Sequence, residues 1–195
     1  MFARRMLKPF LVTVFALASS AAFAHAGHSG EPGFLAGFLH PFLGADHLAA
    51  MLAVGIWSAM TTRRVWIAPL AFVSLLLAGA LLTGFAGFAI PAMEPMIAAS
   101  LLVIGLLLAM RARLPIAIGS IVIGLFALFH GAAHGAELAS AHPAAALSGM
   151  AAGTAMIHFA GIWLGFFLNR QRVFYARAVG GAISLFGIGL LAGMA

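Results

Sequence analysis

The chain has 195 residues, of which 64% are hydrophobic and only 7% are charged. A soluble domain has about 25% charged residues, so this chain cannot cover itself with polar surface and must lie in a membrane. The formal net charge of +6 does not indicate nucleic-acid binding, because the arginines form short clusters between apolar segments, as in membrane proteins. The absence of cysteine excludes disulfides, thiolate metal sites and iron–sulfur clusters.

Residues 1–24 have the pattern of a cleavable secretory signal peptide. Arg4, Arg5 and Lys8 precede a short apolar segment, and the small-residue pattern "AFA" ends at Ala24. A basic start, a short apolar segment and a small-residue site are the marks of an export signal. Cleavage after Ala24 would leave residues 25–195 as a single transmembrane domain that begins outside the cytoplasm. An uncleaved first helix is the alternative.

Apolar segments after the signal predict six transmembrane helices, because a spanning helix needs about 20 apolar residues. The abundance of Gly, Ala and Ser in these segments predicts close helix packing. We therefore expect an all-α membrane protein in which six transmembrane helices form a compact bundle. The predicted helices cover approximately residues 34–60, 65–88, 93–110, 114–134, 143–168 and 173–194.

The arginines predict the orientation of the bundle. All seven arginines of the mature chain follow the first, third and fifth predicted spans, whereas the loops on the other side have neither Lys nor Arg. The positive-inside rule places the arginine-containing loops in the cytoplasm and both termini outside. The arginines are Arg63, Arg64, Arg111, Arg113, Arg170, Arg172 and Arg177.

The first span contains ionisable residues in the segment "HPFLGADHLAAM". His40, His47 and Met51 are spaced seven and four residues apart, so they would lie along one stripe of a regular helix, with Asp46 about 100° away. Pro41 suits the first turn of a helix, which predicts that the helix begins there with His40 at its outer end. Asp46 and His47 would then lie about 8–10 Å deeper.

The fourth span ends in "FHGAAHGAEL". His130, His134 and Glu137 are spaced i, i+4, i+7, so one helix face offers two imidazoles and a carboxylate to a single ion. The glutamate of the metalloprotease motif His-Glu-x-x-His is missing from this segment. In the predicted orientation, this cluster and that of the first span both lie in the outer part of the membrane, where they can face the same cavity.

Two further residues, with Met51, are secondary candidates for contact with a metal ion. Glu94 lies at the outer start of the third span, where it either favours the helix N-terminus electrostatically or has a functional role. His158 lies in the middle of the fifth span, either as a packed and hydrogen-bonded core residue or as part of an ion path. His142, before Pro143 in a loop, is interpreted as a structural or surface residue.

The candidate residues predict metal chemistry. An ionisable residue inside a membrane is costly and indicates function; hydrogen bonding between helices is the alternative. Imidazole and carboxylate without thiolate suit Ni²⁺, Co²⁺, Zn²⁺ or Cu²⁺ better than Mg²⁺ or Ca²⁺. Ligands at successive depths, from His40 through His47 to His158, fit passage better than storage. This order favours import.

The segment "HPFLGADHLAAMLAVGIWSA" resembles the signature of the HupE/UreJ family, and "FHGAAHGAEL" resembles its second motif. The segments "PAMEPMIAASLLVIG" and "GTAMIHFAGIWLG" resemble further parts of this family, so the likeness covers essentially the whole mature chain. It implies a six-helix protein of the bacterial inner membrane, with a cleaved signal, that imports Ni²⁺ or Co²⁺ for maturation of hydrogenase or urease. The residues that it implies in metal handling are His40, Asp46, His47, His130, His134 and Glu137.

Spacing alone does not separate nickel from cobalt or zinc, so the identity of the cation comes from the resemblance. The sequence has no P-loop, which predicts a secondary transporter or facilitator rather than an ATPase. Proton coupling through Asp46 or Glu137 remains open, as do the oligomeric state and delivery to maturation proteins. The alternatives are a metal-dependent intramembrane hydrolase with Zn²⁺, a b-type cytochrome, and a metal sensor or chaperone that does not transport.

Overall fold

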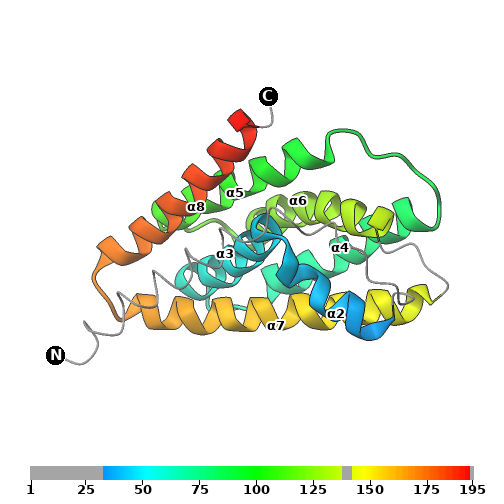
Figure 1. The fold of residues 1–195 in the computed structure, drawn as a ribbon. Helices are drawn as coiled ribbons and strands as arrows, with labels where there is room; N and C mark the ends of the chain where they lie inside the picture. The colour runs from blue at the N-terminus through cyan, green and yellow to red at the C-terminus, as the bar shows by residue number, and fades with distance from the viewer. Residues whose placement is uncertain (1–32, 138–141, 194–195) are drawn as a thin grey trace.

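The computed structural model describes residues 33–137 and 142–193, although the side chains of residues 136 and 137 lie outside this description. The described part is entirely helical, as predicted (Figure 1). The predicted signal peptide, residues 1–24, lies outside the described residues. The helices are α2 (Phe34–Leu43), α3 (Ala45–Thr61), α4 (Ile67–Gly84), α5 (Met93–Ala109), α6 (Ile116–Glu137), α7 (Pro143–Asn169) and α8 (Val173–Gly193).

Length and apolar composition identify four of the described helices as able to cross a membrane, namely α4, α6, α7 and α8. Helices α2 and α3 count as a fifth candidate span if the bent pair is one span. Helix α5 coincides with the predicted third span but has only 17 residues. The chain is therefore a multi-pass helical protein with four or five candidate spans, and the count of six stays a prediction.

The first predicted span is not one regular helix. Helices α2 and α3 meet at an angle of 86°, and Gly44 between them has an extended backbone with φ −91° and ψ 118°. The helix also begins at Phe34, so that Pro41 lies inside α2 and not in its first turn. The predictions of a helix start at Pro41 and of a single stripe joining His40, His47 and Met51 are therefore wrong.

The physical reason for the break lies in Pro41 and Gly44. Pro41 has no backbone N–H to donate within α2. A Cβ atom on Gly44 would lie 3.0 Å from Asp46 Oδ1 and 3.1 Å from His47 Nδ1, so glycine leaves room for these side chains to approach each other. Asp46 then lies in the first turn of α3, where a negative charge is stabilised by the helix dipole.

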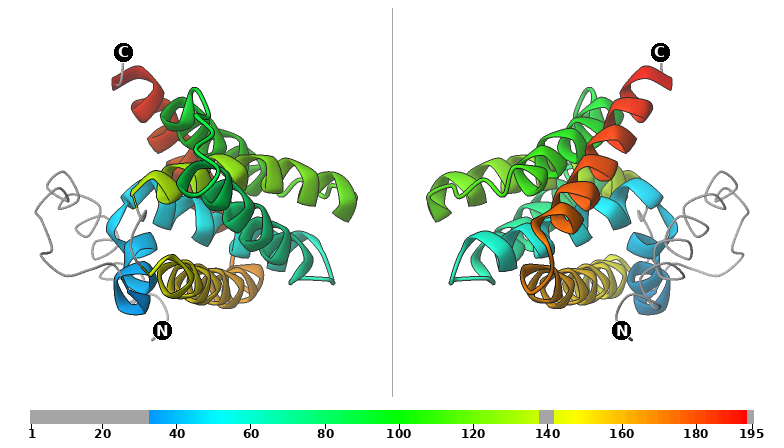
Figure 2. Two further views of the ribbon diagram at one scale, coloured as in Figure 1. Left: turned by 90° about the vertical axis from the view of Figure 1, so that its right-hand side faces the viewer. Right: turned by 90° about the vertical axis from the view of Figure 1, so that its left-hand side faces the viewer.

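Helix α3 is central among the described helices. It packs against α2, α4, α5, α7 and α8, while α4 pairs closely with α6, and α5 with α8. Figure 2 shows α2 beside α7 on one side of the bundle and α8 crossing α5 on the other. The core around α3 includes the fully buried side chains of Met51, Trp57, Phe72 and Met150. This packing brings α3 against α2, which carries His40, and α7, which carries His158.

Candidate functional site

Four histidine rings from three helices lie in contact, and we call them the imidazole cluster: His40, His47, His130 and His134. The ring centroid of His134 lies 4.6 Å from that of His40 and 4.4 Å from that of His47. The ring of His130 lies 4.9 Å from that of His47. The structure therefore brings together the two motifs that the sequence places more than 80 residues apart.

The bend at Gly44 makes this cluster possible. On a straight helix, His40 and His47 would be separated by roughly 10 Å along the axis. In the bent pair, both rings contact the same ring, that of His134. The prediction that His47 lies deeper than His40 assumed a straight helix. In the structure, both rings instead lie around the ring of His134.

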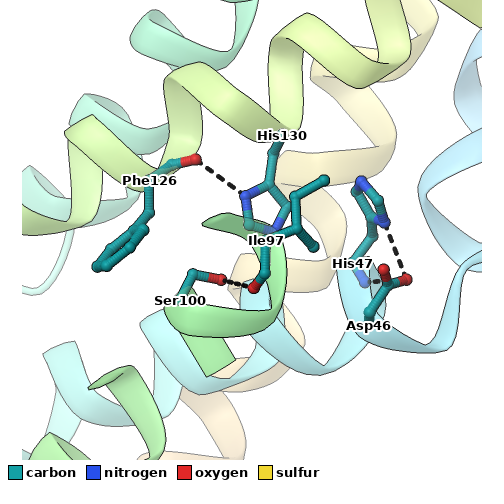
Figure 3. A network of polar contacts seen from close by, with 6 residues as sticks. All are labelled: Asp46, His47, Ile97, Ser100, Phe126 and His130. Carbon is teal, nitrogen blue, oxygen red and sulfur yellow. Dashed lines mark hydrogen bonds and ion pairs between the residues drawn. The ribbon is translucent and has the colours of Figure 1, made fainter. Parts of the chain in front are cut away.

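Asp46 is paired with its neighbour His47 (Figure 3). Asp46 Oδ1 accepts a hydrogen bond of 2.8 Å from the backbone N–H of His47 and lies 2.9 Å from His47 Nδ1. An ionised carboxylate only accepts hydrogen bonds, so the hydrogen of a neutral His47 ring lies on Nδ1. The lone pair of His47 Nε2 is then available for a cation, an arrangement seen when a carboxylate orients a histidine ligand.

The two histidines of α6 are buried, and most of their ring nitrogens have no hydrogen-bond partner among the described residues. His130 Nδ1 lies 3.0 Å from the carbonyl oxygen of Phe126, which orients the ring with Nε2 away from that carbonyl (Figure 3). Among the described residues, His130 Nε2, His47 Nε2 and both ring nitrogens of His134 have no hydrogen-bond partner. Because buried polar atoms without partners are costly, these nitrogens are suited to receive a ligand.

The rings of the cluster stand at steep angles to each other. The interplanar angle is 77° between His40 and His134, and 81° between His47 and His130. Within residues 33–135 and 142–193, no group of three His, Asp or Glu side chains has the arrangement that holds a metal ion. Simultaneous ligation by three of these side chains therefore requires a rotation of at least one ring.

The remaining sequence candidates lie in different places. Glu137 is the last residue of α6, and its side chain lies outside the described residues. Glu94 is exposed in the first turn of α5, at the predicted helix start. Met51 is fully buried in the apolar core with Phe72 and Trp57. His142 is exposed directly before α7, as predicted.

His158 is packed inside the bundle, but it is not hydrogen-bonded within the described part of the chain. Its side chain is 1% exposed, and neither ring nitrogen has a partner there. The ring of Phe72 lies 5.0 Å from that of His158 and 5.5 Å from that of His130. The sequence analysis missed Phe72, because a phenylalanine in an apolar helix carries no signal of such a position.

Comparison with known proteins identifies the family of the chain. A family model described as "HupE / UreJ protein" matches residues 13–190. The protein named "Protein HupE" from Rhizobium leguminosarum bv. viciae is 42% identical over 185 residues, which cover 93% of this chain and 96% of that protein. No solved structure matches the chain.

Proposed function

This chain belongs to the HupE/UreJ family of multi-pass membrane proteins, and from that premise we propose that it is a permease that imports Ni²⁺ or Co²⁺. The cation would serve the maturation of a hydrogenase or a urease. In the proposed orientation, six membrane passages place both termini outside and the arginine-containing loops in the cytoplasm. The chain acts as a secondary transporter or facilitator and not as an enzyme.

The imidazole cluster is the observation that carries this proposal. Its members come from α2, α3 and α6, and its unpartnered nitrogens are buried between the helices. Neutral imidazole is a good ligand for Ni²⁺, Co²⁺ and Zn²⁺. A transported ion must be bound weakly enough to leave, and ligands that rotate between partners fit that requirement better than a closed cage.

The entering cation first meets the imidazole cluster from the outer side. His40, His47, His130 and His134 replace part of its water shell, and Glu137 at the end of α6 adds a carboxylate. Asp46 holds the His47 ring with Nε2 directed away from the carboxylate. Inward movement of a divalent cation gains roughly 4–5 kcal/mol per 100 mV of membrane potential, which is sufficient to drive uptake without ATP.

Uptake of ⁶³Ni²⁺ into cells that lack their own nickel transporter tests the proposal. Cells that express the chain are expected to accumulate nickel above the level of cells with an empty vector. An excess of unlabelled Co²⁺ is expected to reduce ⁶³Ni²⁺ uptake by competition. A parallel assay with unlabelled Zn²⁺ ranks its affinity against those of Ni²⁺ and Co²⁺. Accumulation equal to that of empty-vector cells, with the protein present in the membrane, would contradict the proposed function.

Asp46 is expected to act on transport through His47. Asp46→Ala removes the acceptor at His47 Nδ1 and is expected to raise the nickel concentration for half-maximal uptake by about 10–100-fold. Asp46→Asn keeps an oxygen that can accept this hydrogen bond, so a smaller increase is expected. The measurement is the concentration dependence of ⁶³Ni²⁺ uptake.

A second comparison separates positioning from direct ligation by Asp46. In a His47→Ala background, Asp46→Ala is expected to add no further loss, because two residues that act as one unit are not additive. Two results together would show that Asp46 acts without His47. Asp46→Asn and Asp46→Ala would reduce uptake equally, and Asp46→Ala would reduce uptake further in the His47→Ala background.

A further inference from the structure

A second pair of buried polar side chains lies on α7, outside the imidazole cluster. Thr154 is 0% exposed and His158 is 1% exposed. The spacing i, i+4 places them on the same face of the helix, one turn apart. Thr154 Oγ1 and both ring nitrogens of His158 have no hydrogen-bond partner among the described residues.

Packing alone does not account for these two residues. A buried hydroxyl or imidazole without a hydrogen-bond partner is destabilising relative to one that has a partner. Threonine in a membrane helix usually bonds a carbonyl of the preceding turn, as Thr61 and Thr83 do with the carbonyl oxygens of Trp57 and Gly79. Thr154 makes no such bond in the described structure, so its hydroxyl is free to take an external ligand.

A single aromatic ring connects this pair to the imidazole cluster. Phe72 of α4 is fully buried, and its ring contacts His130 on one helix and His158 on another. The face of an aromatic ring attracts a cation, and the attraction is stronger when both are desolvated. The ring of Phe72 is therefore in contact with one histidine of the imidazole cluster and with His158.

We propose that Thr154 and His158 form a second, inner binding station for the transported divalent cation, separated from the imidazole cluster by the ring of Phe72. The proposal rests on the permease function proposed above. One imidazole nitrogen and one hydroxyl oxygen replace two waters of the ion, and the other ligands remain water. His158 lies roughly 22 Å along α7 from Pro143, beyond the middle of the helix. A weak station at this depth suits an ion that must be released inward.

The test uses the full chain purified without a histidine tag. ⁶³Ni²⁺ binding is measured by equilibrium dialysis, and ⁶³Ni²⁺ uptake is measured in vesicles that contain the same protein. His158→Leu is expected to bind one ion fewer than the unchanged chain and to transport at least about tenfold more slowly. Ile157→Leu, a change of the neighbouring buried residue, is the control and is expected to keep both properties.

The hydroxyl is tested by a pair of near-isosteric changes, which also serve if His158→Leu does not fold. Thr154→Val removes the hydroxyl ligand and keeps the shape of the side chain, so it is expected to slow transport. Thr154→Ser keeps the hydroxyl and is expected to transport at the rate of the unchanged chain. The proposal of an inner station would be overturned if His158→Leu or Thr154→Val bound and transported nickel as the unchanged chain does. If the unchanged chain binds nickel but does not transport it, the proposed permease function fails, while the loss of one ion in His158→Leu still supports the station.

Discussion

A His134→Ala variant is expected to lose nickel uptake by at least about tenfold, which is the largest effect among single changes in the imidazole cluster. The ring of His134 contacts those of both His40 and His47, so its removal takes away the ring that connects α6 with the histidine of α2 as well as that of α3. The residue is almost fully buried. The measurement is the initial rate of ⁶³Ni²⁺ uptake, normalised to the amount of protein in the membrane.

His142→Ala is the matched control for this prediction. His142 is exposed and precedes α7 in the chain, so the same type of substitution removes an imidazole outside the cluster. Its uptake is expected to stay close to that of the unchanged protein. Normal uptake by His134→Ala, or an equal loss in both variants, would contradict the assignment of transport to the cluster.

A Gly131→Ala variant is expected to lose stability rather than only activity. A Cβ atom on Gly131 would overlap the carbonyl oxygen of Leu76, and would lie 2.6 Å from its carbonyl carbon and 2.8 Å from its Cα. Because these are backbone atoms, α4 and α6 must separate to accept one methyl group. Overpacking of this kind costs about 1–3 kcal/mol, and it also displaces the helix that carries His130 and His134.

Thermal unfolding of the detergent-solubilised protein measures this effect, together with the amount of protein recovered from the membrane. Gly181→Ala is the control, because a Cβ atom on Gly181 of α8 meets no atom within 4 Å. We expect a clear decrease in the unfolding temperature for Gly131→Ala and little change for Gly181→Ala. Equal unfolding temperatures in the two variants would show that α4 and α6 do not pack as closely as described.

The sequence was sufficient to predict which segments are helical and which histidines come together in the cluster. Long apolar segments are a strong signal in membrane proteins, and each predicted segment coincides with helix in the described structure. The spacing of His130 and His134 predicted that one face of α6 carries both rings, and both contact His47. These features follow from helical periodicity, which is a local property.

The bend at Gly44 could not be derived from the same reasoning. A glycine three residues after Pro41 is compatible with a continuous helix or with a break, and packing against the other helices decides between the two. The straight helix was the simpler prediction and it was wrong, which also removed the expected stripe through Met51. Phe72 and Thr154 had no local signal, because their positions depend on how α4 and α7 pack.

Nickel flux through the purified protein tests the central claim most directly. The full chain is reconstituted into sealed liposomes that contain a nickel-quenched fluorescent dye, and an inside-negative membrane potential is imposed before Ni²⁺ is added outside. The account predicts rapid quenching with the unchanged chain and with His142→Ala. With His134→Ala, it predicts quenching no faster than in protein-free liposomes. Quenching by the unchanged chain no faster than in protein-free liposomes would contradict the account.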